Sequence, residues 1–150
     1  MNKLACGRTK LPKVLSRMIL MAGIAFSPPV LAQGSSIPYG GGAGTAQKFQ
    51  RFHEDRDEFA KTGKVFRIEG HCQSACTLFL KLKNVCIDPN AELLFHAGRS
   101  PHSTQVMLDS YNGRLRSFLM ANHYMDTPQF HTISGHDMIQ RFGYKQCPGT

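Results

Sequence analysis

Hydrophobic residues switch between helical and strand-like spacing along this chain, and the pattern predicts a mixed α/β domain. Apolar side chains at helical spacing mark an amphipathic helix from Thr45 to Thr62, with Gly63 as its stop. The β-forming run from Val65 to Ile68 ends at Gly70 and predicts a strand. A polar turn follows, and an apolar segment from Thr77 to Leu82 predicts a second helix. The first half of the domain is therefore expected to run helix, strand, turn, helix.

The second half begins with a strand predicted from Val85 to Phe95, interrupted at Asp88-Pro89-Asn90. Residues 99–102 are expected to form a loop. A helix is then predicted from Ser103 or Thr104 to Leu119, and Gly113 weakens it by about 1 kcal/mol without breaking the pattern.

A last short helix is predicted from Gly135 to Phe142, capped by Ser134 and ended by Gly143. The order of elements suits a layered α/β fold, in which a small sheet of mainly parallel strands is flanked by helices.

The N-terminal segment has the composition of an export signal. Five cations and no acidic residue precede the apolar run from Met18 to Phe26, and Val30-Leu31-Ala32 supplies small or apolar residues before a cleavage point. The run is far shorter than the ~20 residues that cross a bilayer, so cleavage after Ala32 is expected rather than a membrane anchor. The predicted organisation is a signal peptide (1–32), a leader with a glycine-rich loop (33–44) and one α/β domain (45–150), located in the periplasm or secreted.

Removing the signal changes the charge balance. The chain has 18 Lys and Arg against 10 Asp and Glu, a net charge of +8. Five of the cations and none of the anions precede Gln33, so the remaining chain has 13 cations against 10 anions, a net charge of +3. No basic run remains, and the pattern gives no indication of nucleic-acid binding.

Four cysteines remain after cleavage: Cys72, Cys76, Cys86 and Cys147. An even number in a short exported chain predicts two disulfides. A helix between Cys76 and Cys86 would hold them ~12–15 Å apart, which is too far for a bond. The two pairings that avoid Cys76–Cys86 both remain open. A zinc site that uses Cys72, Cys76 and nearby histidines is the alternative, but the spacing is not that of a zinc knuckle, so no metal is expected.

Ser74 and His96 are the candidate catalytic residues. Ser74 occupies a sharp turn between a strand and a helix, an arrangement that exposes a nucleophilic hydroxyl at the positive end of a helix dipole. His96 follows the next strand and could act as its base. The Ala75 N–H would then point toward the oxyanion that forms after attack. The structural alternative is a helix-capping serine and a partly buried histidine.

The runs G-H-C-Q-S-A-C-T-L-F-L (70–80) and V-C-I-D-P-N-A-E-L-L-F-H-A (85–97) resemble the Clp-protease proteolytic subunit and the wider crotonase-like superfamily. They are most similar to small exported bacterial members with a Cys-x-Ser-Ala-Cys-Thr turn. The resemblance implies a trimmed crotonase-like fold, shorter than a full subunit of that superfamily and cross-linked here by disulfides. It implies Ser74 as nucleophile and His96 as base. It also implies that Gly41 and Gly42 belong to the oxyanion loop.

The resemblance also implies a third catalytic residue, an aspartate shortly before the last helix. That position falls near Phe130 or His131, where this chain has no acid, and Asp126 is the nearest acidic residue upstream. Asp126 is therefore the candidate orienting residue.

The function predicted from these features is an exported serine hydrolase, peptidase-like, acting on a peptide or acyl-type substrate without a cofactor. A homo-oligomer is compatible with the resemblance. The alternative is a catalytically inactive binding or scaffold domain of the cell envelope, which would keep the fold but not the chemistry.

Overall fold

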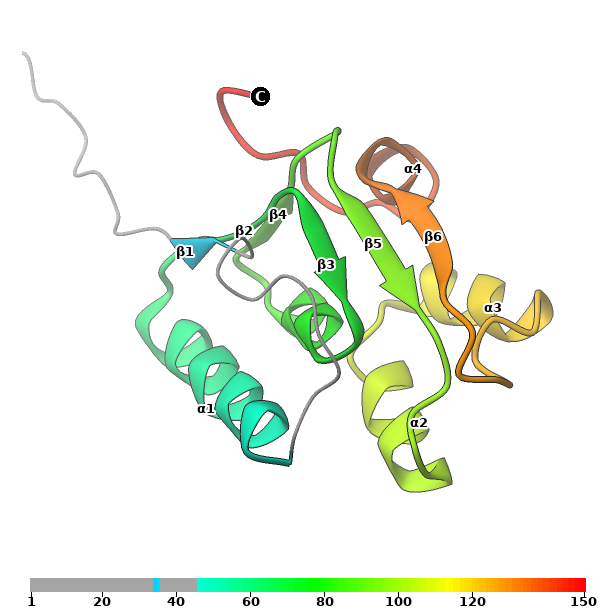
Figure 1. The fold of residues 1–150 in the computed structure, drawn as a ribbon. Helices are drawn as coiled ribbons and strands as arrows, with labels where there is room; N and C mark the ends of the chain where they lie inside the picture. The colour runs from blue at the N-terminus through cyan, green and yellow to red at the C-terminus, as the bar shows by residue number, and fades with distance from the viewer. Residues whose placement is uncertain (1–33, 36–45) are drawn as a thin grey trace, which may run out of the picture.

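The computed structural model describes residues 34–35 and 46–150, so the predicted signal peptide and the glycines Gly41 and Gly42 lie outside it. The elements in chain order are β1 (Gly34–Ser35), α1 (Ala46–Thr62), β2 (Phe66–Ile68), β3 (His71–Gln73), the 3₁₀ helix η2 (Ser74–Lys81), β4 (Val85–Ile87), β5 (Glu92–Phe95), α2 (Pro101–Leu108), α3 (Gly113–Ala121), β6 (His131–Ser134) and α4 (Gly135–Gln140). Short strands occupy the centre of the molecule, and helices flank them (Figure 1). This is the α/β arrangement with small sheets that the sequence predicted.

The strands form two small sheets rather than one. The first contains β1, β2 and β4, all parallel. The second has the order β3-β5-β6, in which β3 and β5 are parallel and β5 and β6 are antiparallel. The chain passes from the first sheet to the second twice, once between β2 and β3 and once between β4 and β5. The expected parallel sheet is thus correct for most of the strand pairs but not for β6.

An aromatic cluster joins α1 to the strands and to η2. The rings of Phe66 and Phe79 stack with their centroids 3.8 Å apart and their planes at 2°. Phe59 meets both rings edge-on from α1, and Gly34 of β1 lies so close to Phe59 that a Cβ there would overlap its ring. Phe66 and Phe79 are fully buried, so this cluster forms the centre of the core beneath the first sheet.

The single strand predicted from Val85 to Phe95 is two strands that belong to different sheets. Asp88 explains the break, because its carbonyl accepts the Ala91 N–H at 3.0 Å and its side chain accepts the Asn90 N–H at 2.8 Å. These bonds close a tight turn in which the chain leaves one ladder and joins the other.

The single helix predicted from Ser103 to Leu119 is likewise two helices. Pro101 occupies the first turn of α2, where its missing N–H costs nothing, and Ser100 caps that helix through reciprocal bonds with Ser103. The second helix starts at Gly113 because Asn112 accepts the Leu115 N–H at 3.0 Å and acts as its N-cap. The predicted loop at residues 99–102 therefore ends earlier than expected.

The last predicted helix is present as α4. Ser134 caps it by accepting the Asp137 N–H, and Gly143 has a φ of 76° just beyond it. Strand β6 was not predicted.

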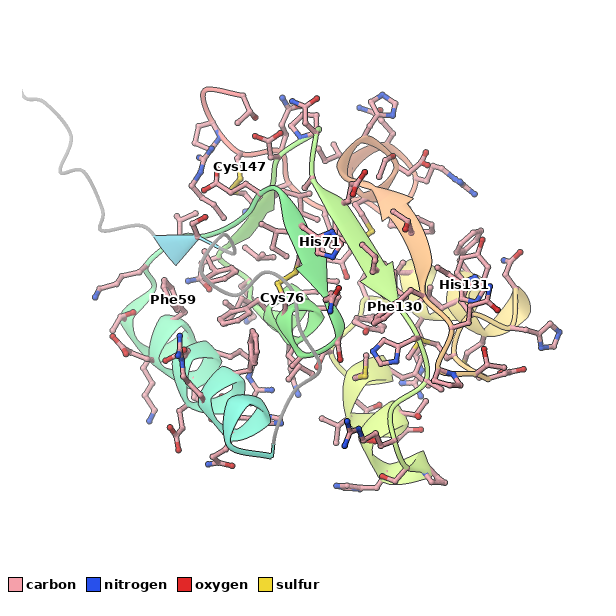
Figure 2. The ribbon with its side chains drawn as sticks, in the orientation of Figure 1. Phe59, His71, Cys76, Phe130, His131 and Cys147 are labelled. Carbon is pink, nitrogen blue, oxygen red and sulfur yellow. A yellow bond between two sulfur atoms is a disulfide. The ribbon has the colours of Figure 1, made fainter. Side chains whose placement is uncertain are left out.

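Two disulfides decide between the pairings that the sequence left open. Cys72 and Cys76 form one bond with their Cα atoms 5.4 Å apart, and Cys86 and Cys147 form the other at 4.8 Å. The first brackets the turn at the start of η2. The second ties the C-terminal segment to β4, where Ile87 also exchanges backbone hydrogen bonds with Lys145 and Cys147. Figure 2 shows Cys147 and Cys76 at these separate places.

None of the helices within the described residues is long and apolar enough to cross a bilayer.

Candidate active site

Ser74 has a backbone conformation that L-amino acids rarely adopt. It directly follows β3, opens η2 and has a φ of 53°. Among the non-glycine residues that the structure describes, only Ser74 and His123 have a positive φ. Such a conformation costs about 1 kcal/mol or more and persists only where its surroundings impose it. The Cys72–Cys76 disulfide spans this residue, so the turn is covalently closed around the candidate nucleophile.

His96 lies at the same end of the second sheet as Ser74. The neighbouring strands β3 and β5 are parallel, and their last aligned pair is Gln73 with Leu94. Ser74 is the next residue on one strand, and His96 is two residues further on the other. Figure 1 shows the arrowheads of β3 and β5 pointing to this same end. Beyond β5, the Ala97 N–H donates to the Thr127 carbonyl at 2.8 Å, which fixes the chain directly after His96.

The imidazole of His96 is held in an apolar setting. Both ring nitrogens are buried, and neither has a hydrogen-bond partner within the described residues. The ring of Phe130 packs against it, with centroids 4.6 Å apart and planes at 64°. Burial lowers the pKa of His96 from its usual 6.5, and the backbone of Ala97 opposes that shift. The imidazole is therefore neutral near pH 7, which is the form that a general base needs.

The structure does not place Asp126 on His96. The carboxylate of Asp126 lies 2.8 Å from Nδ1 of His123, and both side chains are largely exposed. At the position where the resemblance implied an acid, Phe130 covers His96 and His131 stacks on Tyr124, with centroids 4.1 Å apart. Ser74 and His96 are also not hydrogen-bonded to each other.

Ala75 lies in the first turn of η2 and is 7 % exposed. An N–H in the first turn of a helix has no partner inside that helix, so the Ala75 N–H is a candidate donor to a negative charge. Gly41 and Gly42, the other two predicted oxyanion residues, lie outside the described residues.

Sequence reasoning missed two buried residues, Thr77 and Tyr111, whose hydrogen bonds support the Ser74 turn. The Thr77 hydroxyl donates to the Ser74 carbonyl at 2.7 Å, and the Tyr111 hydroxyl lies 2.7 Å from Thr77 Oγ1. Thr77 is the one polar residue among the apolar positions of η2, and that irregularity was the available signal. Tyr111 gave no signal, because it fits the apolar face of the helix that was predicted there.

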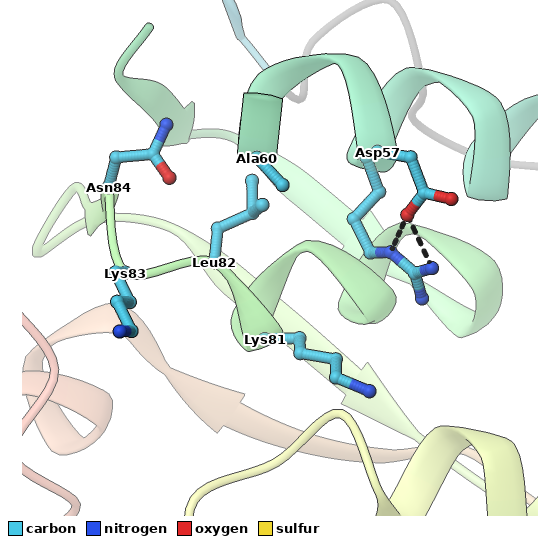
Figure 3. Close-up of a pocket in the computed structure, with 7 residues that line it drawn as sticks. Asp57, Ala60, Lys81, Leu82, Lys83 and Asn84 are labelled. Atoms are coloured by element: carbon cyan, nitrogen blue, oxygen red, sulfur yellow. Dashed lines mark hydrogen bonds and ion pairs between the residues drawn. The ribbon is translucent and has the colours of Figure 1, made fainter. Parts of the chain in front are cut away.

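Two surface hollows lie at different distances from this site. The larger, of about 530 Å³, is lined by residues of α1 and by the end of η2: Arg56, Asp57, Ala60, Lys81, Leu82, Lys83 and Asn84 (Figure 3). It adjoins the opposite end of η2 from Ser74. The other, of about 420 Å³, includes Ala97, Gly98, Arg99 and Asp126, so it begins directly after His96. This second hollow adjoins the segment after β5, and neither Ser74 nor His96 is among the residues that line it.

No group of three or more His, Cys, Asp or Glu side chains in the described part of the chain is arranged to hold a metal ion. The cysteines that the zinc alternative would use, Cys72, Cys76 and Cys86, are paired in disulfides.

Comparison with known proteins adds no assignment: no protein-family model matches this chain, and no curated protein matches it significantly.

Proposed function

We propose that this protein is an exported serine hydrolase of trimmed crotonase-like fold that acts on a peptide or acyl-type carbonyl. The observation that carries the proposal is the left-handed backbone of Ser74 at a strand-to-helix turn, next to the end of the strand that delivers His96. A residue in a sparsely populated conformation at such a turn is typical of nucleophilic serines. The imidazole of His96 supports it, because its buried ring nitrogens have no hydrogen-bond partner among the residues that the structure describes, and a native protein rarely leaves such groups unsatisfied without a use.

The reaction follows from these positions. The Ser74 Oγ attacks the substrate carbonyl carbon while His96 takes the hydroxyl proton, and the Ala75 N–H binds the oxyanion. His96 then protonates the leaving group as the carbon–leaving group bond breaks. A water molecule, deprotonated by His96, then attacks the acyl carbon, the bond from that carbon to Ser74 Oγ breaks, and His96 returns the proton to Oγ. The hydrogen bond from Ser74 to His96 has to form when substrate binds. Catalytic hydrogen bonds in other enzymes are often long or poorly aligned without substrate and shorten when it binds.

The two disulfides support a location in the periplasm or the extracellular medium. Two bonds in a small chain are typical of oxidising compartments such as the periplasm or the extracellular medium.

The experiment is covalent labelling of the oxidised chain from Gln33 with a fluorophosphonate, read by intact mass. We expect one adduct per chain, lost in Ser74→Ala and strongly reduced in His96→Gln. Ser117→Ala is the matched control, because Ser117 is exposed on α3 and has no role in the site. Labelling that survives in Ser74→Ala would refute the proposal.

A catalytically inactive binding or scaffold domain is the second candidate. The contact of Phe130 with His96 favours it, because an apolar ring occupies the place where a triad has its acid. This candidate predicts no labelling of the folded, disulfide-bonded protein, together with unchanged thermal stability in Ser74→Ala.

A further inference from the structure

Tyr111 lies in the core and contacts one residue near each half of the candidate site. It lies in the turn between α2 and α3 and is 7 % exposed. Its hydroxyl is 2.7 Å from Thr77 Oγ1, and its ring meets the ring of Phe95 edge-on, with centroids 5.3 Å apart and planes at 86°. Thr77 belongs to the helix that Ser74 opens, and Phe95 directly precedes His96. One buried side chain therefore contacts the supports of the nucleophile and of the base.

Counting hydrogens fixes the direction of the hydrogen bonds. The Ser74 carbonyl can only accept, so the Thr77 hydroxyl donates its single hydrogen to that oxygen. The hydrogen between Tyr111 and Thr77 must then come from Tyr111. Burial raises the pKa of Tyr111 far above its usual value, so the phenol keeps this hydrogen throughout the working pH range. The result is a directed chain from Tyr111 through Thr77 to Ser74, and Thr77 is fully buried within it.

The end of this chain controls a group that the proposed reaction uses. The Ser74 carbonyl and the Ala75 N–H belong to one planar trans peptide, so they point in opposite directions and turn together. A hydrogen bond that fixes the carbonyl inward thereby fixes the N–H outward. The 2.7 Å bond from Thr77 to the Ser74 carbonyl therefore sets the direction of the Ala75 N–H.

We infer that Tyr111 and Thr77 are positioning residues that aim the Ala75 N–H at the oxyanion formed on a Ser74-bound substrate. The inference rests on the proposed function for its catalytic consequence, but the orientation of the peptide is independent of catalysis. Neither residue touches substrate, because both are buried behind the turn.

The variants Thr77→Val, Thr77→Ser and Tyr111→Phe separate this role from packing. Thr77→Val keeps the shape and removes the hydroxyl, so we expect the fluorophosphonate labelling rate constant to fall by about 10- to 100-fold. Thr77→Ser restores the hydroxyl and should return most of the rate. Tyr111→Phe removes only the first bond of the chain and should give a smaller loss.

The double variant Thr77→Val/Tyr111→Phe tests whether the two residues act in series. Once Thr77 has lost its hydroxyl, Tyr111 has no route to Ser74, so the double variant should label no more slowly than Thr77→Val alone. Tyr144→Phe is the matched control, since Tyr144 is 9 % exposed and its hydroxyl accepts the Asn112 N–H at 3.2 Å. It should lose stability in urea unfolding without losing labelling rate.

The backbone NMR signals of Ser74 and Ala75 provide a readout that needs no activity. Thr77→Val should shift the Ser74 carbonyl ¹³C and the Ala75 amide resonances, and Tyr144→Phe should leave both in place. If the wild type does not label but these shifts appear, the serine hydrolase proposal fails while the positioning of the peptide is supported. The inference is overturned if Thr77→Val labels like the wild type with unchanged Ser74 and Ala75 signals, or if Tyr144→Phe slows labelling as much as Thr77→Val.

Discussion

At the scale of single residues, His96 combines two properties that a catalytic base requires. Its ring nitrogens are shielded from water, which lowers the pKa of the imidazole, and within the described part of the chain they have no side-chain partner that would compete with a serine hydroxyl. A structural histidine in the same place would be expected to donate at least one hydrogen bond to the protein. The pH dependence of labelling and of stability therefore tests the role of His96.

We expect the rate of fluorophosphonate labelling to rise with pH and to reach half of its plateau below pH 6.5. The reason is that burial lowers the pKa of His96, and only the neutral imidazole accepts the Ser74 proton. The same shift makes the unfolded chain bind a proton that the folded chain refuses, so stability falls as the pH falls from 6.5 through the folded pKa. His96→Gln should remove that part of the pH dependence in urea unfolding. A half-maximum clearly above pH 6.5 would contradict the prediction.

Replacing Phe130 with an acid should change the protonation of His96. Phe130→Asp exchanges an apolar ring at 4.6 Å for a carboxylate, so we expect the pKa of His96 to rise, as measured by NMR titration in the Ser74→Ala background. Phe130→Leu is the control, because it keeps an apolar cover over the imidazole and should leave the pKa low. Phe130 is 45 % exposed, which makes both changes tolerable for the fold. An unchanged pKa in Phe130→Asp would mean that the two side chains do not interact.

At the scale of elements, caps decide where the helices of the C-terminal half begin. Asn112 accepts the Leu115 N–H and donates to the Phe142 carbonyl at 2.8 Å, so one side chain both starts α3 and holds the segment after α4. Gly113 follows it with open space around its Cα. The two adjacent residues therefore differ sharply in what they contribute.

Substitutions at these two positions should have opposite effects on stability. Asn112→Ala should lower the free energy of unfolding by about 1–3 kcal/mol, because it removes a cap and a hydrogen bond to a backbone carbonyl. Gly113→Ala should raise it by up to about 1 kcal/mol, since the methyl group meets no neighbour and the unfolded chain loses freedom. Urea unfolding measures both. A stabilised Asn112→Ala would show that α3 does not depend on this cap.

The elements also show which parts of the fold can be predicted from the sequence. Helix α1 was predictable because Phe52 and Phe59 lie on one face and pack on the core. The break between α2 and α3 was not, because Leu108 before it, Tyr111 within it and Leu115 after it are all buried and preserve the helical spacing. Strand β6 was missed because only Ile133 in it is buried, which leaves no alternating pattern.

For the site, the strand-turn-helix pattern and the family resemblance pointed to Ser74 and His96, and the structure places both at the same end of the second sheet. The residues around them were not predictable, because Thr77 meets Tyr111 across 34 positions of sequence, and Phe130 meets His96 across a similar gap. Such pairs depend on how whole segments pack. The sequence of either segment alone carries no sign of the other.

At the scale of the whole molecule, the two disulfides have different tasks. Cys86–Cys147 joins residues 61 positions apart and connects the C-terminus to the first sheet, whereas Cys72–Cys76 joins residues 4 apart within the Ser74 turn. The loop-closure model assigns about 4 kcal/mol to the long connection and about 2 kcal/mol to the short one. One bond mainly stabilises the fold, and the other mainly shapes the site.

Removing each bond should therefore affect different measurements. Cys86→Ala/Cys147→Ala should lower the thermal midpoint more, and Cys72→Ala/Cys76→Ala should lower the labelling rate more when both variants are compared at a temperature where they are folded. Calorimetry and fluorophosphonate labelling on the same samples give the comparison. Equal effects of both pairs on labelling would show that the short bond acts only through stability.

The chain crosses between the sheets through two short links, β2 to β3 and β4 to β5, and these links bear on the register of β5. The strands β2 and β3 are joined by two residues and β4 and β5 by four, and the ladder resumes directly, because Asp88 donates to Ile68 and Glu92 donates to Gly70. The link between β4 and β5 is thus two residues longer than the link between β2 and β3. Because two is an even number, Leu93 and Phe95 face the core. A one-residue shift in the register of β5 would turn Leu93 and Phe95 away from the core and carry Leu94 and His96 to the opposite face, whereas a shift of two residues would preserve the facing. The position of His96 therefore depends on a turn that contains neither Ser74 nor His96.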